Sequence, residues 1–346
     1  MILTDLTRLL LDGRRLEPAR LEDALHVVMR GEAEAIPLAG FLCALASRAV
    51  DGALLAAAAR VLRSHGGRVH AQVRPLIDTC GTGGDGSGSF NISTATACVL
   101  AAAGAAVAKH GNRGVSSAVG SADVLEACGA RLALEPAQAC RLLDATGFVF
   151  LFAQAFHPAM RHVAPVRKAL GVRTIFNLLG PLANPAGADH QVVGVYDPNL
   201  TRPVAEALRE LGAKQALVVH CDGLDEIGLH AITVGHRVRR GLIEEYRLDP
   251  TTLGLAPAPI AALRGGDAAR NAELLREALD DRGGPRSDVV ALNAAAALEL
   301  IGRATDLREG LTLARGLMSS GRARRALERY CESSSRSGGE DVRACS

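Results

Sequence analysis

Short apolar runs alternate with glycine-containing loops and helix-like segments from Pro75 onward. This alternation predicts an α/β domain with a mostly parallel sheet flanked by helices on both faces, because parallel strands need a crossover between them. The runs expected to form strands are PLIDT, AAVAKH, FVFLFA, QVVGVY and KQALVVHC. The later segment AITVGHRVRRGLIEEYRL is typical of a β-hairpin, and alanine- and leucine-rich helices follow it.

The first part of the chain has a different pattern. Up to about His70, apolar residues recur at three-to-four spacing, with Gly or Pro between the segments. We therefore expect a small N-terminal helical domain at 1–72, with helices from about 160–185 as candidates to join it. A larger catalytic domain follows at 73–331, and the Ser- and Gly-rich residues 332–346 are expected to form a flexible tail. Surplus apolar surface on the helical domain predicts a homodimer.

Composition excludes several classes of protein. Lys and Arg (39) nearly balance Asp and Glu (37), so a basic surface for nucleic acid is not expected. Trp is absent and aromatic residues make up only 3%, which disfavours base stacking and a membrane-interface belt. The eight cysteines form no C-x-x-C pair, and the opening residues do not match a signal peptide. We expect a cytoplasmic protein that binds neither nucleic acid nor membrane.

A glycine-rich loop, Asp78 to Gly86, follows the first predicted strand and precedes a helix. Glycines let backbone N–H groups approach a ligand, and a helix N-terminus adds positive partial charge, so this place suits phosphate. Ser93 or Thr94 could cap the helix and touch the ligand. The spelling also fits G-x-G-x-x-G, but no acid occurs from Gly86 to Ala122 to hold a nicotinamide ribose. Dinucleotide binding is therefore disfavoured.

Two further loops carry charged residues at the ends of predicted strands. Lys109-His110-Gly111-Asn112-Arg113 is basic, and it precedes serines and a second helix. Two neighbouring anion loops imply more than one phosphate group, as in a polyphosphorylated sugar. Asp225 and Glu226 follow the strand QALVVHC and suit a Mg²⁺ ion that shares its coordination shell with phosphates.

Together these motifs resemble the anthranilate phosphoribosyltransferases, in the nucleoside-phosphorylase-like group. The resemblance runs from the N-terminal helices to about residue 330. It depends on GTGGDG, FNIST, KHGNR, SADVLEACG, FHPAM, VRKALGVRTIFNLLGPLANP and GLDE. It implies transfer of the 5-phosphoribosyl group from phosphoribosyl pyrophosphate to the amine of anthranilate, a step of tryptophan biosynthesis. Open alternatives are transfer to another aminobenzoate, a pyrimidine nucleoside phosphorylase, and a non-catalytic nucleic-acid-binding relative.

The resemblance also implies the roles of individual residues. It places Mg²⁺ on Ser93, Asp225 and Glu226, and anthranilate near Gly81, Asn112, His157 and Arg167. The residues expected to contact phosphoribosyl pyrophosphate are Gly81, Gly84, Asp85, Ser89, Asn91, Ser93, Thr94, Lys109, Asn112, Arg113, Ser117 and Ser121.

Two cations are expected to act in the reaction itself. Lys109 stabilises the charge that develops on the leaving pyrophosphate, and Arg167 holds the anthranilate carboxylate so that the amine is aimed. The histidines His110 and His157 are not assigned as general bases. The chain departs from the family pattern at Cys80, Ser89, Val119 and Gln154-Ala155, which leaves acceptor selectivity open.

Overall fold

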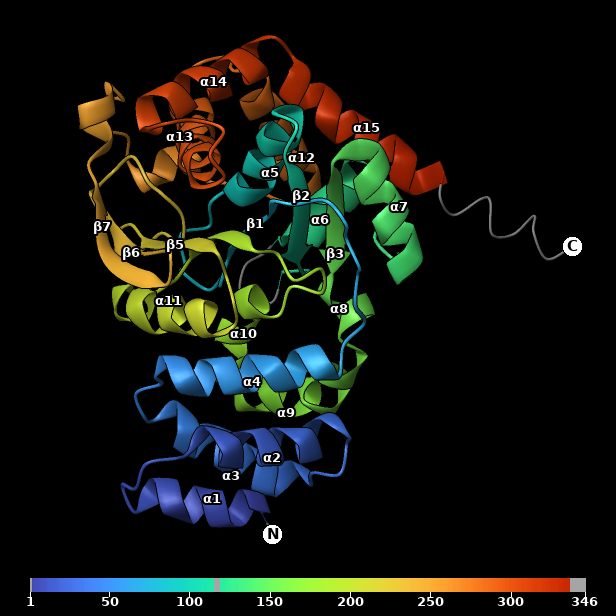
Figure 1. Ribbon diagram of the computed structural model, residues 1–346, viewed down its shortest axis with the longest axis vertical. Coiled ribbons are helices and arrows are strands. Elements are labelled where there is room, and N and C mark those ends of the chain that lie inside the picture. The colour runs from blue at the N-terminus through green and yellow to red at the C-terminus, as the bar shows by residue number, and fades with distance from the viewer. Residues whose placement is uncertain (1, 115–118, 337–346) are drawn as a thin grey trace, which may run out of the picture.

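Helices at the N-terminus form the smaller lobe of the molecule, at the bottom of Figure 1. The structure is a computed structural model that describes residues 2–114 and 119–336. The lobe contains α1 (Ile2–Leu11), α2 (Pro18–Met29), α3 (Ala35–Ala46) and α4 (Gly52–Ser64). Leu6, Leu21 and Leu25 recur on the inner faces of α1 and α2 and are buried, as the apolar spacing predicts. Asp51 begins α4 by accepting a hydrogen bond from the Leu54 amide (2.9 Å).

A mixed sheet forms the centre of the larger lobe. Within the described residues it has seven strands in the order β3-β2-β1-β4-β5-β6-β7. The strands β1 to β5 pair in parallel, and β6 and β7 form the antiparallel hairpin at one edge. Both the parallel sheet and the hairpin are confirmed. The strands are β1 (Leu76–Gly81), β2 (Ala106–Gly111), β3 (Phe148–Phe152), β4 (His190–Gly194), β5 (Gln215–His220), β6 (Thr233–Arg239) and β7 (Leu242–Leu248).

Helices cover both faces of the sheet (Figure 1). One apolar core lies between the sheet and α5, α6, α7 and α12 to α15, and it contains Phe148, Phe150 and Tyr330. The helices of this layer are α5 (Ile92–Ala102), α6 (Ser121–Ala127), α7 (Pro136–Thr146), α12 (Ala268–Leu279), α13 (Pro285–Leu300), α14 (Leu307–Ser319) and α15 (Arg322–Arg336). Strands buried from both sides explain why the predicted runs are almost wholly apolar.

The opposite face of the sheet shares its core with the N-terminal helices. Val193 and Val218 of the sheet belong to the same buried cluster as Leu55 of α4 and Leu179. The helix α4 packs on α10 and α11, and α9 packs on α3. The elements on this side are α8 (Ala153–Phe156), α9 (Ala164–Leu170), α10 (Phe176–Leu182) and α11 (Thr201–Glu210). Short 3₁₀ helices complete the fold: η1 (Pro158–His162), η2 (Pro198–Leu200), η3 (Pro250–Leu253) and η4 (Ile260–Leu263).

The strand order changes direction at β1. The chain proceeds from β1 to β2 and β3 on one side, and then returns to place β4 on the other side of β1. Loops that leave β1 and β4 diverge at such a point, and ligands of parallel α/β sheets bind in the crevice that results. The glycine-rich loop leaves β1, so the topology places it at this crevice.

Two expectations need correction. The flexible tail was expected from residue 332, but α15 continues through Arg336. Ser334 is buried there and accepts a hydrogen bond from the Arg131 amide (3.1 Å), so packing overrides the weak helix preference of a Ser-rich segment. The first helix after the glycine loop begins at Ile92, with Asn91 at its N-cap, so neither Ser93 nor Thr94 caps it. Among the described residues, no helix has the length and apolar character needed to cross a membrane.

Candidate active site

A polar cavity of about 300 Å³ opens at the carboxyl ends of β1 and β2. Four segments line it: the loop after β1, the loop after β2, the acidic loop after β5, and the stretch from α9 to α10. The predicted site residues found in its lining are Gly81, Gly84, Asp85, Ser89, Asn91, Ser93, Lys109, Asn112, Arg113, Ser121, Arg167, Asp225 and Glu226.

Three predicted site residues are not in this lining. Ser117 lies outside the described residues. Thr94 is fully buried in α5 and its Oγ1 has no hydrogen-bond partner among the described residues. His157 is buried as well, and it lines a second cavity behind the first. The structure therefore does not bring Thr94 and His157 to the main cavity.

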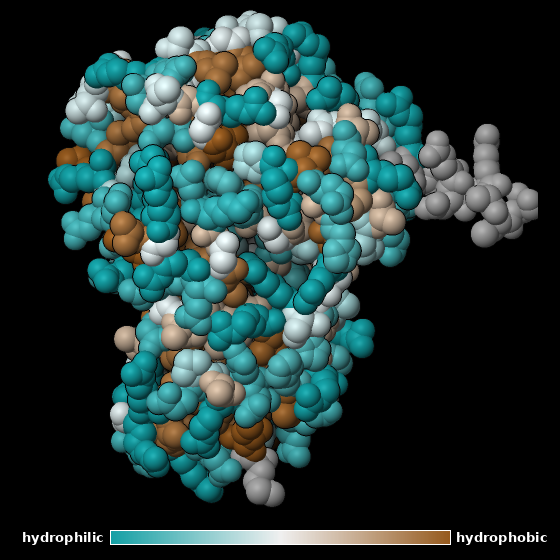
Figure 2. Space-filling model, viewed as in Figure 1, coloured by the Kyte–Doolittle hydropathy of each residue, from teal (hydrophilic) through white to brown (hydrophobic). Residues whose placement is uncertain are grey.

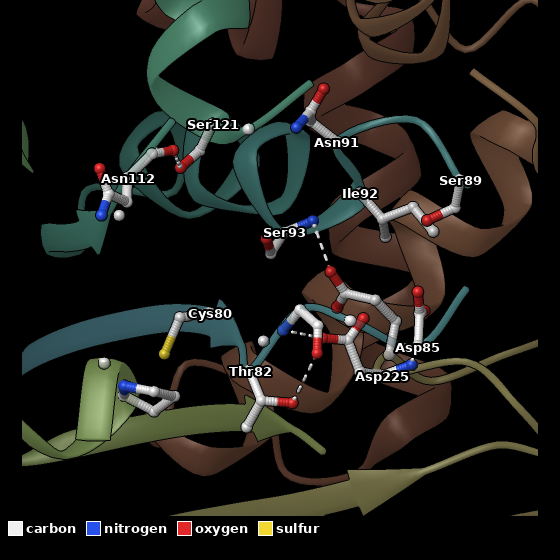
Figure 3. A pocket seen from close by; sticks show the side chains of 18 of the residues that line it. Cys80, Thr82, Asp85, Ser89, Asn91, Ile92, Ser93, Asn112, Ser121 and Asp225 are labelled. Carbon is white, nitrogen blue, oxygen red and sulfur yellow. Dashed lines mark hydrogen bonds between the residues drawn. The ribbon is translucent and has the colours of Figure 1, made fainter. Parts of the chain in front are cut away.

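The glycine-rich loop is hydrogen-bonded directly to the acidic loop. The Gly83 amide donates to Asp225 Oδ2 (2.7 Å), and Gly83, Gly84, Gly86 and Gly88 all have positive φ. A Cβ on Gly81 would lie 2.2 Å from Asp225 Oδ2, so only glycine allows this close approach. Figure 3 shows the Asp85 and Asp225 side chains close together on one side of the cavity, with Asn112 and Ser121 on the other.

Lys109 lines the cavity and is almost fully buried. It is 2% exposed, and its Nζ donates to the carbonyl oxygen of Thr79 and to Ser93 Oγ (3.1 Å). The same Ser93 donates its backbone N–H to Glu226 Oε1 (3.0 Å). The ammonium group is thus held between β1, α5 and the acidic loop, where a developing negative charge would feel it in a low-dielectric setting.

Three acidic side chains gather beside this lysine without enough cations to balance them. Burial, with Asp85 and Glu226 nearby, raises the pKa of Asp225 well above its ordinary value. Burial raises the pKa of Glu226 to about 7, although Lys109 opposes the shift. No group of three His, Cys, Asp or Glu within 2–114 and 119–336 could hold a metal by itself. The carboxylates of Asp225 and Glu226 therefore suit a Mg²⁺ ion that completes its shell with water and substrate oxygens.

The opposite wall is formed by α9 and α10. Arg167 is buried enough to lower the pKa of its guanidinium; it lies 5.7 Å from the Phe176 ring centre, and its Nη2 donates to Asn177 Oδ1 (3.4 Å). Gly180 and Pro181 complete this wall. Sequence reasoning did not assign Phe176, Asn177, Gly180 or Pro181 to the site, although the motif VRKALGVRTIFNLLGPLANP contains them.

Comparison with known proteins identifies the fold and the family. The residues 73–324 match the model of the glycosyl transferase family α/β domain, and residues 4–66 match its helical bundle domain. An anthranilate phosphoribosyltransferase from Symbiobacterium thermophilum is 51% identical over 94% of this chain and 96% of its own length. The crystal structure of the Thermus thermophilus enzyme is 46% identical, with a TM-score of 0.89 over 95% of this chain and 99% of that chain.

The chain belongs to the anthranilate phosphoribosyltransferase family. A structure of the Saccharomyces cerevisiae anthranilate phosphoribosyltransferase in complex with PRPP and Mg is 28% identical, with a TM-score of 0.88 over 96% of this chain and 98% of that chain. The predicted family and fold class are both confirmed.

Arg113, which was expected to contact phosphoribosyl pyrophosphate, is paired with two carboxylates of the following helix, α6. Arg113 forms ion pairs with Asp123 (3.0 Å) and Glu126, and it lies 5.5 Å from the Phe152 ring centre. The hydrogen bonds that the guanidinium donates to these carboxylates raise its pKa. Arg113 lines the cavity, but its positive charge is largely balanced by the carboxylates of Asp123 and Glu126 on α6.

Three departures from the family pattern line the cavity, namely Cys80, Ser89 and Val119, and a fourth, Gln154, contacts the lining residue Asn112. Val119 is part of the lining, where the family usually has serine. Gln154 stands near the position of a family proline, and its Nε2 donates to Asn112 Oδ1 (3.4 Å). A proline side chain could not donate that hydrogen bond, so in this chain Asn112 Oδ1 has an additional polar neighbour.

The histidines near the cavity are uncharged and structural. Burial, with His157 adjacent, lowers the pKa of His110 to about 3, and burial also lowers the pKa of His157. Their rings meet edge to face, 5.2 Å apart, and each ring makes a hydrogen bond to a backbone carbonyl near the end of α10. Neither ring has the pKa of an effective base at neutral pH.

Proposed function

We propose that this chain transfers the 5-phosphoribosyl group from phosphoribosyl pyrophosphate to the amine of anthranilate. The products are pyrophosphate and N-(5-phosphoribosyl)anthranilate, and the reaction is a step of tryptophan biosynthesis. One observation supports this most strongly in a member of this family: the glycine loop, the KHGNR loop and the acidic pair converge on one cavity.

The phosphoribosyl pyrophosphate would bind between the loops after β1 and β2. Backbone N–H groups of the glycine loop and the N-terminus of α5 favour phosphate oxygens. Ser89, Asn91, Ser93, Asn112 and Ser121 offer hydroxyl and amide groups in the same lining. Thr94 and Arg113 are weaker candidates, because the first is buried in α5 and the second is paired with carboxylates.

A magnesium ion would be held by Asp225, Glu226 and Ser93. When bound, it neutralises the phosphate charge and assists departure of pyrophosphate. Its positive charge would also stabilise the ionised forms of Asp225 and Glu226, whose pKa values are raised chiefly by burial and further by neighbouring carboxylates. The relative from Saccharomyces cerevisiae with PRPP and Mg supports this assignment.

The residues of the chain would act mainly by positioning and electrostatics. As the bond between C1 of the ribose and pyrophosphate breaks, negative charge grows on the leaving oxygens, and Lys109 stabilises it. The aryl amine of anthranilate is already neutral at pH 7, so it needs orientation more than deprotonation. The fork of Arg167 would hold the carboxylate and aim the nitrogen at C1, with Gly81 and Asn112 beside the ring.

A homodimer in the cytoplasm, with a helical domain at 1–72 and a catalytic domain at 73–331, completes the proposal. Large apolar side chains remain exposed on the small lobe and its neighbour, with Leu11 at 72%, Ile36 at 86% and Val172 at 53%. Figure 2 shows hydrophobic patches among hydrophilic ones on this lobe. A second copy covering them would remove this surface from water. The described cysteines are all free, as expected in a reducing compartment.

The decisive experiment follows the fluorescence of anthranilate mixed with pure protein, Mg²⁺ and phosphoribosyl pyrophosphate. We expect the fluorescence to fall only when all components are present, with release of pyrophosphate in equal amount. A protein that leaves anthranilate unchanged but consumes another aminobenzoate would support the alternative acceptor. Consumption of neither, together with tight retention on heparin at moderate salt, would support the nucleic-acid-binding relative.

A further inference from the structure

A second cavity of about 410 Å³ lies between the linker that joins the two lobes and the turn before β4. The linker contributes residues 67–72 and Arg74, and the turn contributes residues 183–187. Backbone hydrogen bonds hold the linker in place, from Gly67 to the Phe156 carbonyl (2.7 Å) and from Val69 to the Pro185 carbonyl (3.0 Å). The walls are therefore built parts of the fold rather than loose side chains.

Basic side chains dominate the lining. Arg63, Arg68, His70 and Arg74 line this linker cavity together with the uncharged His157, and no Asp or Glu is among the described residues that do so. The nearest carboxylate contact is from Arg74 to Asp189, 3.9 Å away. Asp189 also pairs with Lys214 (2.9 Å) and His190 (3.0 Å), so it cannot neutralise the arginines as well.

Among these residues, Arg63 gives the strongest indication that the cavity binds an anion. It is half-buried at the end of α4, and its Nε donates to the Leu182 carbonyl (2.7 Å). Within the described part of the chain it forms no ion pair, and burial lowers its pKa to about 10. A half-buried guanidinium without a carboxylate partner keeps a positive charge that an anion in the cavity could balance. Arg68, on the linker itself, is exposed, and its side chain forms no hydrogen bond or ion pair within residues 2–114 and 119–336.

We propose that the linker cavity binds a small oxyanion of the phosphate type, held by Arg63 and Arg68 with support from Arg74. Guanidinium groups match tetrahedral oxyanions through paired N–H donors. An occupant would bridge α4, the linker and the turn before β4. It would also lie behind His157, whose ring packs on His110 in the wall of the main cavity. Free phosphate and the pyrophosphate released in the proposed reaction share this chemistry.

The test uses the absence of Trp from the chain. Gln72 is exposed and lines the linker cavity, so Gln72→Trp provides a unique fluorophore beside it. Titration with inorganic sulfate, phosphate and pyrophosphate at constant ionic strength should change its emission saturably. Arg68→Gln in the same background should weaken sulfate binding about tenfold, because a charge-assisted hydrogen bond is lost. Calorimetry of the unlabelled chain provides an independent measurement.

Two control variants separate this cavity from general charge and from the main cavity. Arg20→Gln removes an exposed arginine on α2, away from the linker, and should leave sulfate binding unchanged. Lys109→Met removes the main-cavity cation and should also leave it unchanged. Binding of pyrophosphate alone would identify the reaction product as the occupant. The proposal fails if neither emission nor heat changes, if Arg68→Gln binds sulfate normally, or if Lys109→Met abolishes binding. Because the probe is sulfate, this outcome does not depend on whether anthranilate is consumed.

Discussion

The backbone N–H of Gly83 donates to Asp225 Oδ2 at 2.7 Å, across 142 residues of sequence. This bond joins the glycine loop after β1 to the acidic loop after β5. The Asp225 amide donates in turn to Asp85 Oδ2 (3.2 Å). The glycine loop and the acidic loop, which we propose to bind phosphate and metal, therefore form one unit, and a change in either loop should disturb the other.

Gly194, at the end of β4, tests this unit without touching a charged group. A Cβ at this position would lie 1.5 Å from the Asp225 carbonyl oxygen, so Gly194→Ala must displace the acidic loop. We expect kcat/KM to fall by about 10²-fold, since a misplacement of about 1 Å can cost that much. Gly316→Ala on α14, where a Cβ meets nothing within 4 Å, is the matched control and should keep normal activity. Steady-state kinetics and circular dichroism would show whether activity is lost while the fold remains.

Neutral substitutions of the acidic pair should separate activity from stability. Asp225→Asn and Glu226→Gln remove groups that would hold Mg²⁺, and we expect turnover to fall by more than about 10²-fold. Without Mg²⁺ both variants should melt no lower than the parent, because each removes a carboxylate whose ionisation burial disfavours. Thermal unfolding and kinetics on the same preparations would check both expectations. A near-normal rate in either variant would exclude that residue as a metal ligand.

The pKa of Glu226, raised to about 7, predicts how pH affects metal binding. The raised value means that the metal-free fold favours the protonated form, so this group's stabilising effect is present below pH about 4.5 and is lost as pH rises through about 7. Binding of Mg²⁺ needs the ionised carboxylate. The apparent Mg²⁺ affinity should therefore fall as pH falls through about 7, by up to about tenfold per pH unit from Glu226 alone, and Asp225, whose pKa is also raised, should steepen the fall. Calorimetric titration between pH 5.5 and 8 would measure this, and Glu226→Gln should flatten the profile.

Arg167 provides a test of acceptor recognition. Arg167→Ala should raise the KM for anthranilate by about 10- to 100-fold, because hydrogen bonds between charged groups contribute about 1.5–3 kcal/mol. The KM for phosphoribosyl pyrophosphate should change little. Arg167→Lys should recover only part of the loss, since a point charge lacks the planar fork. If only the KM for phosphoribosyl pyrophosphate increased, Arg167 would contact that substrate and not anthranilate.

The sequence predicted the parts of the site that depend on local chemistry. Glycines after β1, Lys109 in the last half of β2 and the acidic pair after β5 were all expected at strand ends, where a parallel sheet brings loops together. The expectation that Ser93 or Thr94 caps the helix was wrong because α5 begins earlier, at Ile92, and Thr94 is buried in its first turn. The helix through Arg336 was missed because Tyr330 and Leu327 anchor it in the core, which composition does not reveal.

Contacts between distant segments could not be predicted. The Arg173 guanidinium stacks on Tyr196, 4.0 Å from the ring centre, and donates to the Gly84 carbonyl. It therefore supports the glycine loop from the segment between α9 and α10. The linker cavity likewise depends on how Arg63 meets residues more than 100 positions away. Such neighbours follow from tertiary packing, for which one sequence carries little periodic signal.

The long sequence separation between the glycine loop and the acidic loop has a consequence for how the protein folds during synthesis. A chain emerging from the ribosome completes the glycine loop well before Asp225 has been synthesised. Bringing these two segments together closes a long loop, which costs more conformational entropy than forming a local helix does. Recovery of catalysis during refolding should therefore lag behind recovery of helical signal. The time course of recovered enzymatic activity would then report when β5 docks against the neighbouring strands.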